Sequence, residues 1–266
     1  MRRPAHYPYD PLVLTLGVDF AADPARTALC WIRWEDGKAD AYEASCGADD
    51  DALVAAFTKA HKVGIDAPFG WPDAFVKAVV EHQNGRPWPD HGSKREALRF
   101  RRTDIAVHDR TRRWPLSVSS DRIAVTTMRL AGVFSLLEQR GDAIARDGSD
   151  RLVEVYPAAA LRIWKFDSQG YKRKENRDER CRLLEAFKAS TQGWLTLPDD
   201  IYRTCEDSDD VLDAVIAGLV ARAKAVELCQ PIPDELRVHA CREGWIALPN
   251  ADSLDRLPAN ESSTSR

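Results

Sequence analysis

The sequence lacks several patterns that commonly identify a function. None of its six cysteines form a C-x-x-C pair, so no thioredoxin-type redox site or cysteine-rich zinc site is indicated. Its six histidines show no metal-ligand spacing, and its glycines form no phosphate-binding loop. No apolar run approaches the length of a membrane span, and the first residues carry no apolar signal core. We therefore expect a reduced, cytoplasmic protein with no membrane association.

An excess of positive charge is absent as well. Thirty-eight Lys and Arg against 42 Asp and Glu give a formal net charge of −4 at pH 7, so no overall field attracts nucleic acid. Any such partner must meet a local patch. With 44% apolar residues, a chain of 266 residues can bury a large core. We expect one domain over residues 1–250 with a helical insertion at about 72–150, followed by a disordered polar tail at 251–266.

What is present is an alternation of strand and helix patterns, which favours an α/β fold. Five strands are predicted, the first three as an antiparallel meander, at 12–20, 27–35, 39–45, 63–66 and from 151 to the break at Pro157. A helix at 48–62 connects the meander to the fourth strand. Strand, helix and strand in series form a right-handed parallel crossover, so the first and fourth strands are expected to be parallel neighbours.

A carboxylate ends both of these strands. The segments "GVDFA" and "GIDAPF" each place an aspartate after a glycine and a β-branched residue, at Asp19 and Asp66. A third acid, Glu154, lies in the fifth strand. Because parallel neighbours end at the same edge of a sheet, we expect Asp19 and Asp66 to lie side by side there.

A late helix, predicted at 208–228, adds further acids. Its segment "DDVLDA" places Asp213 three residues after Asp210 and four after Asp209, so either can share its helix face. Carboxylates that converge cannot all ionise cheaply unless a cation lies between them. Hard oxygen ligands of this kind suit Mg²⁺ or Mn²⁺, and two such ions can hold both oxygens of an in-line phosphoryl displacement.

One stretch is rich in positive charge. Residues 94–113 hold eight Lys or Arg side chains against three acids. Because arginine forks match phosphate oxygens, we expect Arg101 or Arg102 to bind a substrate phosphate. The alternative is a structural helix or loop in which these two arginines pair with Asp104 and Asp109.

The acids on the first and fourth strands, with D-x-x-D on a late helix, resemble the ribonuclease H-like fold, whose Holliday-junction resolvase branch shares the late-helix arrangement. More closely, "GVDFA", "GIDAPFGWP", "FRRTD", "PLSVSSDR", "EVYPAA", "DDVLDA" and "EGWIALP" together resemble the domain-of-unknown-function family 429, described as predicted nucleases of that fold. The resemblance covers roughly residues 12–250 and implies a five-stranded mixed sheet flanked by helices. It also implies metal-dependent phosphodiester hydrolysis, with five acids in matching positions: Asp19, Asp66, Glu154, Asp210 and Asp213.

The leading hypothesis is therefore a Mg²⁺- or Mn²⁺-dependent nuclease acting on nucleic acid. Asp19 would bridge two ions, Asp66 and Glu154 would each hold one, and Asp213 with Asp210 would complete the second. One alternative is a non-catalytic nucleic-acid or nucleotide binding module of the same fold. Another is a phosphotransferase of the actin and sugar-kinase type. That type needs a glycine-rich turn after the first strand, and "DFAADPA" offers none.

Overall fold

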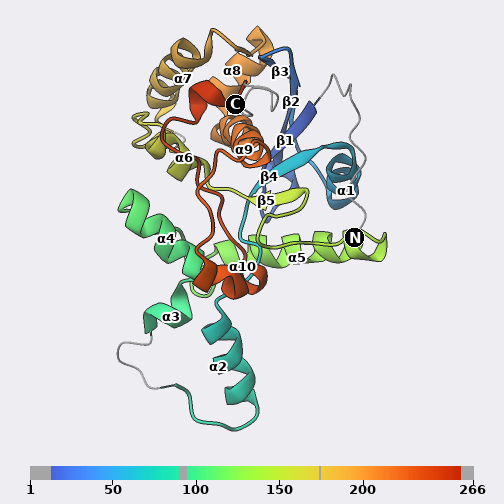
Figure 1. Ribbon diagram of the computed structural model, residues 1–266, viewed down its shortest axis with the longest axis vertical. Coiled ribbons are helices and arrows are strands. Elements are labelled where there is room, and N and C mark those ends of the chain that lie inside the picture. The colour runs from blue at the N-terminus through green and yellow to red at the C-terminus, as the bar shows by residue number, and fades with distance from the viewer. Residues whose placement is uncertain (1–12, 90–94, 174, 259–266) are drawn as a thin grey trace, which may run out of the picture.

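The central feature of the protein is a six-stranded mixed sheet with the strand order β5-β4-β1-β2-β3-β6 (Figure 1). The computed structural model describes residues 13–89, 95–173 and 175–258. The strands are β1 (Val13–Asp19), β2 (Ala28–Glu35), β3 (Lys38–Cys46), β4 (Lys62–Asp66), β5 (Leu152–Glu154) and β6 (Leu195–Thr196). The first three form the expected antiparallel meander, and β4 pairs in parallel with both β1 and β5. The predicted α/β class and mixed sheet are confirmed.

The prediction of five strands is wrong by one. The additional strand, β6, has only two residues and pairs in parallel with Ala39 and Asp40 of β3 at the sheet edge. A strand this short has no alternation of apolar and polar residues to detect, because one repeat already takes two residues. The tertiary contact with β3, rather than the local pattern, creates it.

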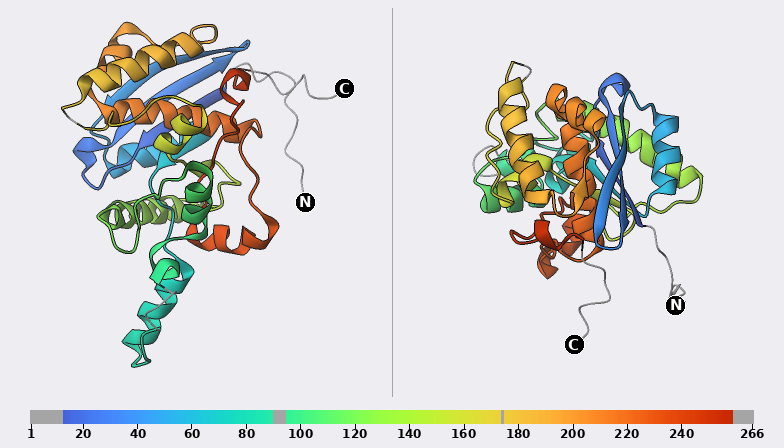
Figure 2. Two further views of the ribbon diagram at one scale, coloured as in Figure 1. Left: turned by 90° about the vertical axis from the view of Figure 1, so that its left-hand side faces the viewer. Right: turned by 90° about the horizontal axis from the view of Figure 1, so that it is seen from above.

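Helices cover both faces of the sheet (Figure 2). The helices on one face are α6 (Pro157–Ile163), α7 (Arg177–Thr191), α8 (Asp199–Asp207) and α9 (Asp209–Ala225). On the other face lie α1 (Asp50–Lys59) and α5 (Ile123–Gln139). Among the residues that the structure describes, none of these or the other helices is long and apolar enough to cross a membrane.

The side chains of β2 show why both faces are covered. Cys30 and Ile32 belong to the core under α9, whereas Leu29 and Trp31 belong to the core under α1 and α5. Successive side chains of a strand point to opposite faces, so the uninterrupted apolar run at 28–32 of β2 must be buried on both sides. The sheet therefore separates two hydrophobic cores.

The segment between β4 and β5 is helical. It contains α2 (Asp73–Gln83), α3 (Arg95–Arg99), α4 (Arg102–Thr111) and α5. In Figures 1 and 2, α2 and α3 extend away from the sheet, whereas α5 lies against it. The chain after α9 returns to this region through η2 (Asp234–Leu236) and α10 (Arg237–Glu243), and then η3 (Leu254–Arg256) packs in the core under α9. A short turn, η1 (Pro24–Arg26), precedes β2.

One buried carboxylate connects the inserted helices to the rest of the chain. Glu243, at the end of α10, accepts the backbone N–H of Asp73 at 2.9 Å and that of Arg102 at 2.7 Å. These two residues are the first of α2 and α4, where backbone N–H groups have no partner within their own helix. Glu243 therefore supplies an acceptor to two helix N-termini at once and fixes their positions relative to α10.

Candidate functional site

Two aspartates lie side by side at the carboxyl edge of the sheet. In the parallel ladder between β1 and β4, Asp19 is the direct register partner of Asp66. Each is the last residue of its strand, so both side chains are at the edge where the ladder stops. The adjacency expected from the repeated glycine, β-branched residue and aspartate is confirmed.

Helix α9 brings a third carboxylate to this edge. The hydroxyl of Ser208 caps the helix by accepting the N–H of Val211 at 3.3 Å, which places Asp213 in the second turn facing the sheet. Asp213 is fully buried. One oxygen atom from each of Asp19, Asp66 and Asp213 lies within 4.8 Å of the other two. We call these three residues the carboxylate group.

Two glycines allow α9 to approach closely enough. A Cβ atom on Gly17 of β1 would collide with the carbonyl oxygen of Ala214, and one on Gly64 of β4 would collide with that of Ala217. The backbone of α9 therefore lies directly against the backbones of the two strands that carry Asp19 and Asp66. A larger residue at either position would have to push the helix, and Asp213 with it, away from the sheet.

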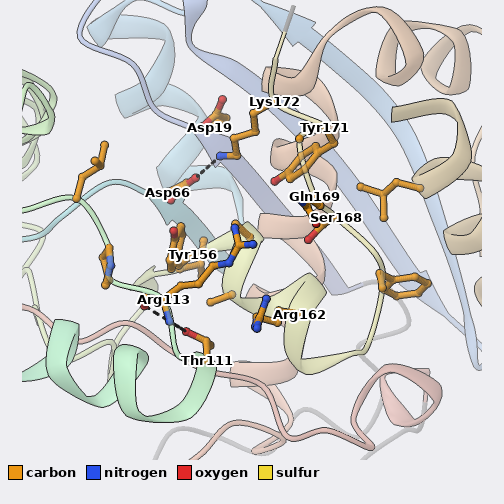
Figure 3. A pocket seen from close by; sticks show the side chains of 18 of the residues that line it. Asp19, Asp66, Thr111, Arg113, Tyr156, Arg162, Ser168, Gln169, Tyr171 and Lys172 are labelled. Carbon is orange, nitrogen blue, oxygen red and sulfur yellow. Dashed lines mark hydrogen bonds and ion pairs between the residues drawn. The ribbon is translucent and has the colours of Figure 1, made fainter. Parts of the chain in front are cut away.

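A lysine from another part of the chain lies at the carboxylate group (Figure 3). The ammonium of Lys172 forms an ion pair with Asp213 and lies 3.8 Å from Oδ2 of Asp66. The neighbouring hydroxyl of Tyr171 donates to Oδ1 of Asp213 at 2.7 Å. The segment between α6 and α7 thus contributes a positive charge and a hydrogen-bond donor to the three acids.

A buried arginine holds this segment in place. Arg180 of α7 donates to the backbone carbonyls of Tyr171 and Arg173, each at 3.0 Å. It also donates to the carbonyl of Glu206 at 3.1 Å and to that of Asp207 at 3.3 Å, at the end of α8. The position of Lys172 over the carboxylates is therefore tied to the packing of α7 on α8.

The acid–base properties of the group reflect its crowding. Burial, followed by the charge of Asp213, raises the pKa of Asp66 to about 7, although Lys172 counteracts part of this rise. Burial and the charges of Asp213 and Asp66 raise the pKa of Asp19 well above its usual value. Burial disfavours the charged form of Lys172, but Asp213 and Asp66 outweigh it and hold the pKa of the ammonium well above its usual range. Repulsion among the carboxylates is thus only partly relieved by the one ammonium.

Glu154 takes a different position from the one expected of a metal ligand. Its carboxylate is paired with both terminal nitrogens of Arg101, at 2.7 and 2.8 Å, and accepts the backbone N–H of Phe69 at 3.0 Å. Both side chains are only 2% exposed. Although its charge contributes to the raised pKa of Asp66, Glu154 is not one of the three acids whose oxygens converge. Glu154 therefore belongs to a buried ion pair with Arg101.

The pair of Arg101 with Glu154 also changes the role expected of the basic stretch at 94–113, which was to bind a substrate phosphate. The guanidinium of Arg101 also donates to Asp104 at 2.9 Å, so it lies buried between two carboxylates and is not free to hold a phosphate. The alternative interpretation, an internal pair with Asp104, is what the structure shows. Arg102 is exposed, but its side chain does not line the cavity described below. Lys94, the first residue of the stretch, lies outside the described residues.

The other two helix acids also lie apart from the group. Asp210 pairs with Arg26, whose Nη2 is 2.7 Å from Oδ1 of Asp210. Neither Asp209 nor Asp210 joins the three acids whose oxygens converge. Either Asp209 or Asp210 was expected to accompany Asp213. Asp213 instead approaches Asp19 and Asp66 without either of them.

The carboxylate group opens into a cavity of about 1230 Å³. Asp19, Asp66 and Lys172 lie at one end of the view in Figure 3, and Arg113 and Arg162 lie at the other. Arg113 follows α4 and Arg162 lies on α6, and neither guanidinium has a carboxylate partner among the described residues. Sequence reasoning missed Tyr171, Lys172 and Arg162, because only contacts distant in sequence bring them here.

A second group of possible metal ligands lies between α2 and α10. The side chains of Asp73, His239 and Glu243 come within 4.8 Å of one another. Both oxygens of Glu243, however, already accept backbone N–H groups at the starts of α2 and α4. His239 in turn lies 3.2 Å from Asp73. We interpret this group as the structural connection between three helices.

Comparison with known protein families assigns the chain. The model of the family described as "Protein of unknown function (DUF429)" matches residues 17–237. The chain belongs to this family. The resemblance based on the ordered motifs is thereby confirmed, and the match includes every residue of the carboxylate group and of the Lys172 segment. No curated protein and no solved structure matches the chain significantly.

Proposed function

We propose that this protein is a divalent-metal-dependent nuclease with a ribonuclease H-like fold. The observation that carries the proposal is the convergence of Asp19, Asp66 and Asp213 within 4.8 Å at one end of a cavity that also contains unpaired arginines. Acids that bind a cation and arginines that bind phosphate are both needed to hydrolyse a phosphodiester.

The sheet supports the fold assignment. An antiparallel meander of β1, β2 and β3 is followed by β4 and β5 in parallel beside β1. The acids lie at the ends of β1 and β4 and on α9, which packs on these strands. This is the order and placement that the resemblance to the ribonuclease H-like fold implies.

The donor set fits Mg²⁺ or Mn²⁺. Three carboxylates are hard oxygen ligands, and both ions prefer such ligands to nitrogen or sulfur. The pKa values of Asp19 and Asp66 are raised first by burial and then by the charges of the neighbouring acids, and a divalent ion would relieve that repulsion. A divalent ion bound by these acids would supply a Lewis acid for the phosphoryl oxygens and activate water for attack.

The surrounding residues prepare the three acids for this task. Tyr171 fixes the orientation of Asp213 through its hydrogen bond to Oδ1. Burial raises the pKa of Glu154, and the paired Arg101 offsets part of this rise while it directs the carboxylate into the pair. Lys172 is positioned to hold the carboxylates together before the ion arrives and to contact the substrate afterwards. Glu154 acts in this scheme through its pair with Arg101 and its contact with the backbone of Phe69 after β4, and not as a ligand.

Cleavage assays with single-stranded, duplex, hybrid and branched substrates test the proposal. The wild-type protein should cleave at least one of them with Mn²⁺ and none in EDTA. Asp19→Asn should abolish cleavage, whereas Asp51→Asn, an exposed acid of α1, should leave it unchanged. A wild type that binds nucleic acid but cleaves none of these substrates with Mn²⁺ would support the binding-module alternative.

A further inference from the structure

The cavity has an aromatic side chain between its acidic and basic ends. The charges of Asp66 and Arg113 both act on Tyr156: burial and Asp66 raise the pKa of its phenol, whereas Arg113 lowers it. In Figure 3, Tyr156 accordingly lies between Asp66 and Arg113. A ligand that extends from the acids to the arginines must pass this ring.

The position of the Tyr156 ring is fixed by packing. It is partly buried against a small cluster formed by Val107 of α4, Ala159 and Ile163 of α6, and Ile246 and Leu248 near the C-terminus. The part of the residue that remains accessible lines the cavity. An aromatic ring held in this way can stack with a flat partner without first losing side-chain entropy.

The two arginines beyond Tyr156 form a place for an anion. Arg113 and Arg162 come from different elements, line the same cavity and have no carboxylate partner among the described residues. Of the other guanidiniums that line the cavity, Arg101 is paired with Glu154 and Arg182 with Glu179 at 2.7 Å, whereas Arg173 is an exposed neighbour of Lys172. Two unpaired guanidiniums that face one space favour a phosphate, which accepts the hydrogen bonds of both.

We propose that the cavity binds single-stranded nucleic acid, with one phosphate at the carboxylate group, an unpaired base on Tyr156 and a second phosphate at Arg113 and Arg162. The proposal deepens the nuclease function above and rests on it for the first phosphate. In a duplex, bases stack on their neighbours and present only their edges. Stacking of a base on a protein ring therefore requires a base that is free of its partner, as in a single strand.

Binding in EDTA tests this without any contribution from cleavage. The probe is a fluorescein-labelled oligothymidylate of about twelve nucleotides, free or paired with its complement, because single-strand sites span about 4–16 nucleotides. The wild type should bind the single strand at least about tenfold more tightly than the duplex. Tyr156→Ala should weaken single-strand binding about ten- to a hundredfold, and Tyr156→Phe, which keeps the ring, should not.

The arginines are tested by the salt dependence of binding. Arg113→Gln with Arg162→Gln should flatten the slope of log affinity against log salt by about 0.7, since the one phosphate that both arginines contact contributes about 0.7 on a single strand. The matched control is Arg110→Gln with Arg203→Gln, which removes the same charge from two exposed arginines outside the cavity. The control should keep the wild-type slope. Circular dichroism and melting curves establish that all variants are folded.

Three results would overturn the proposal: equal affinity for duplex and single strand, an unchanged affinity in Tyr156→Ala, or equal salt slopes in the two double variants. A thymidine diphosphate that binds as tightly as the oligonucleotide would overturn it as well, in favour of a nucleotide site. A different result would exclude the nuclease function and leave the binding site unaffected. Single-strand binding with the expected mutational pattern, but no cleavage with Mn²⁺, would remove the catalytic function and leave the binding site.

Discussion

The ammonium of Lys172 does part of what a divalent ion would do for the carboxylates around it. It pairs with Asp213 and lies 3.8 Å from Asp66, but it brings one positive charge to three acids. An ion with two charges is electrostatically the better partner, whereas the lysine has the advantage of being attached to the chain. At the scale of single residues, Lys172 and the proposed ion would therefore compete for the same oxygens.

Replacing Lys172 by Met tests this competition. Methionine keeps much of the side-chain length and removes the charge, so the Mn²⁺ affinity measured by isothermal titration calorimetry should rise about tenfold. The metal-free variant should lose about 1–3 kcal/mol of unfolding free energy, a value between those of buried and exposed pairs because Lys172 is 42% exposed. Lys59→Met, on the exposed end of α1, should change neither quantity. A lower Mn²⁺ affinity in Lys172→Met would show that the lysine supports the ion instead.

The pH dependence of Mn²⁺ binding follows from Asp66. Its pKa in the metal-free fold is about 7 against a usual value of 3.8, so the folded chain holds a proton that the unfolded chain has released between these pH values. The contribution of Asp66 to metal-free stability is therefore greatest below about pH 4 and declines as the pH rises towards 7. Because Mn²⁺ needs the ionised form, its affinity should rise up to about tenfold per pH unit to at least pH 7. Titrations that show constant affinity above about pH 5 would contradict this.

At the scale of secondary-structure elements, the site depends on the contact of α9 with β1 and β4. Only glycine fits at positions 17 and 64, because the helix backbone occupies the space of a side chain there. Interiors packed this closely transmit a displacement to their neighbours instead of absorbing it. The contacts at Gly17 and Gly64 therefore determine how far Asp213 lies from Asp19 and Asp66.

Gly17→Ala should push α9 away from β1. The added methyl group meets the carbonyl of Ala214, so we expect a loss of about 1–3 kcal/mol in urea-unfolding free energy and a loss of most Mn²⁺ affinity. The control is Gly132→Ala in α5, where a Cβ has no atom within 4 Å. That substitution should raise stability by about 0.5–1 kcal/mol, since alanine is the better helix former. A Gly17→Ala protein with wild-type Mn²⁺ binding would disprove the dependence on this contact.

At the scale of the whole molecule, the proposed binding of an ion to the carboxylate group would be linked to unfolding. The group is assembled from β1, β4 and α9, which are far apart in sequence and meet only in the folded chain. An ion that binds the folded state alone stabilises the entire domain by mass action. The melting temperature therefore reports on a site that occupies a small part of the structure.

Mn²⁺ should accordingly raise the melting temperature in a concentration-dependent manner. At one hundred times its dissociation constant the stabilisation is about 2.7 kcal/mol, or about 5–10 °C for a chain of this size. Asp19→Asn should diminish the shift and stabilise the metal-free protein, because it removes one of three repelling charges. Asp51→Asn serves as the control and should show the wild-type shift. A melting curve that millimolar Mn²⁺ leaves unchanged would remove the metal from the proposal.

The sequence predicted the parts of the site that depend on local pattern. The strands ending in Asp19 and Asp66 and the helix carrying Asp213 follow from apolar periodicity and from the parallel crossover between β1 and β4. Lys172 could not be predicted, because its partners lie about 40 and 106 residues away and a mixed-charge loop has no periodic signal. Charged residues such as Arg101 and Glu154 are usually exposed, so the sequence does not indicate that they are buried. The fold shows that they form an ion pair in the interior.

The position of Lys172 at the carboxylates has a consequence for the order of folding and metal binding. If the three acids bind a metal as proposed, a newly synthesised chain can complete its fold with Lys172 at the carboxylates before the metal binds. Metal binding would then exchange an ion for the ammonium on a folded protein. The segment that carries Lys172 would stay in place through Tyr171 and Arg180, so the ammonium could return when the ion leaves. Such a protein can pass repeatedly between an idle and a charged form without unfolding, and its activity would follow the supply of the ion.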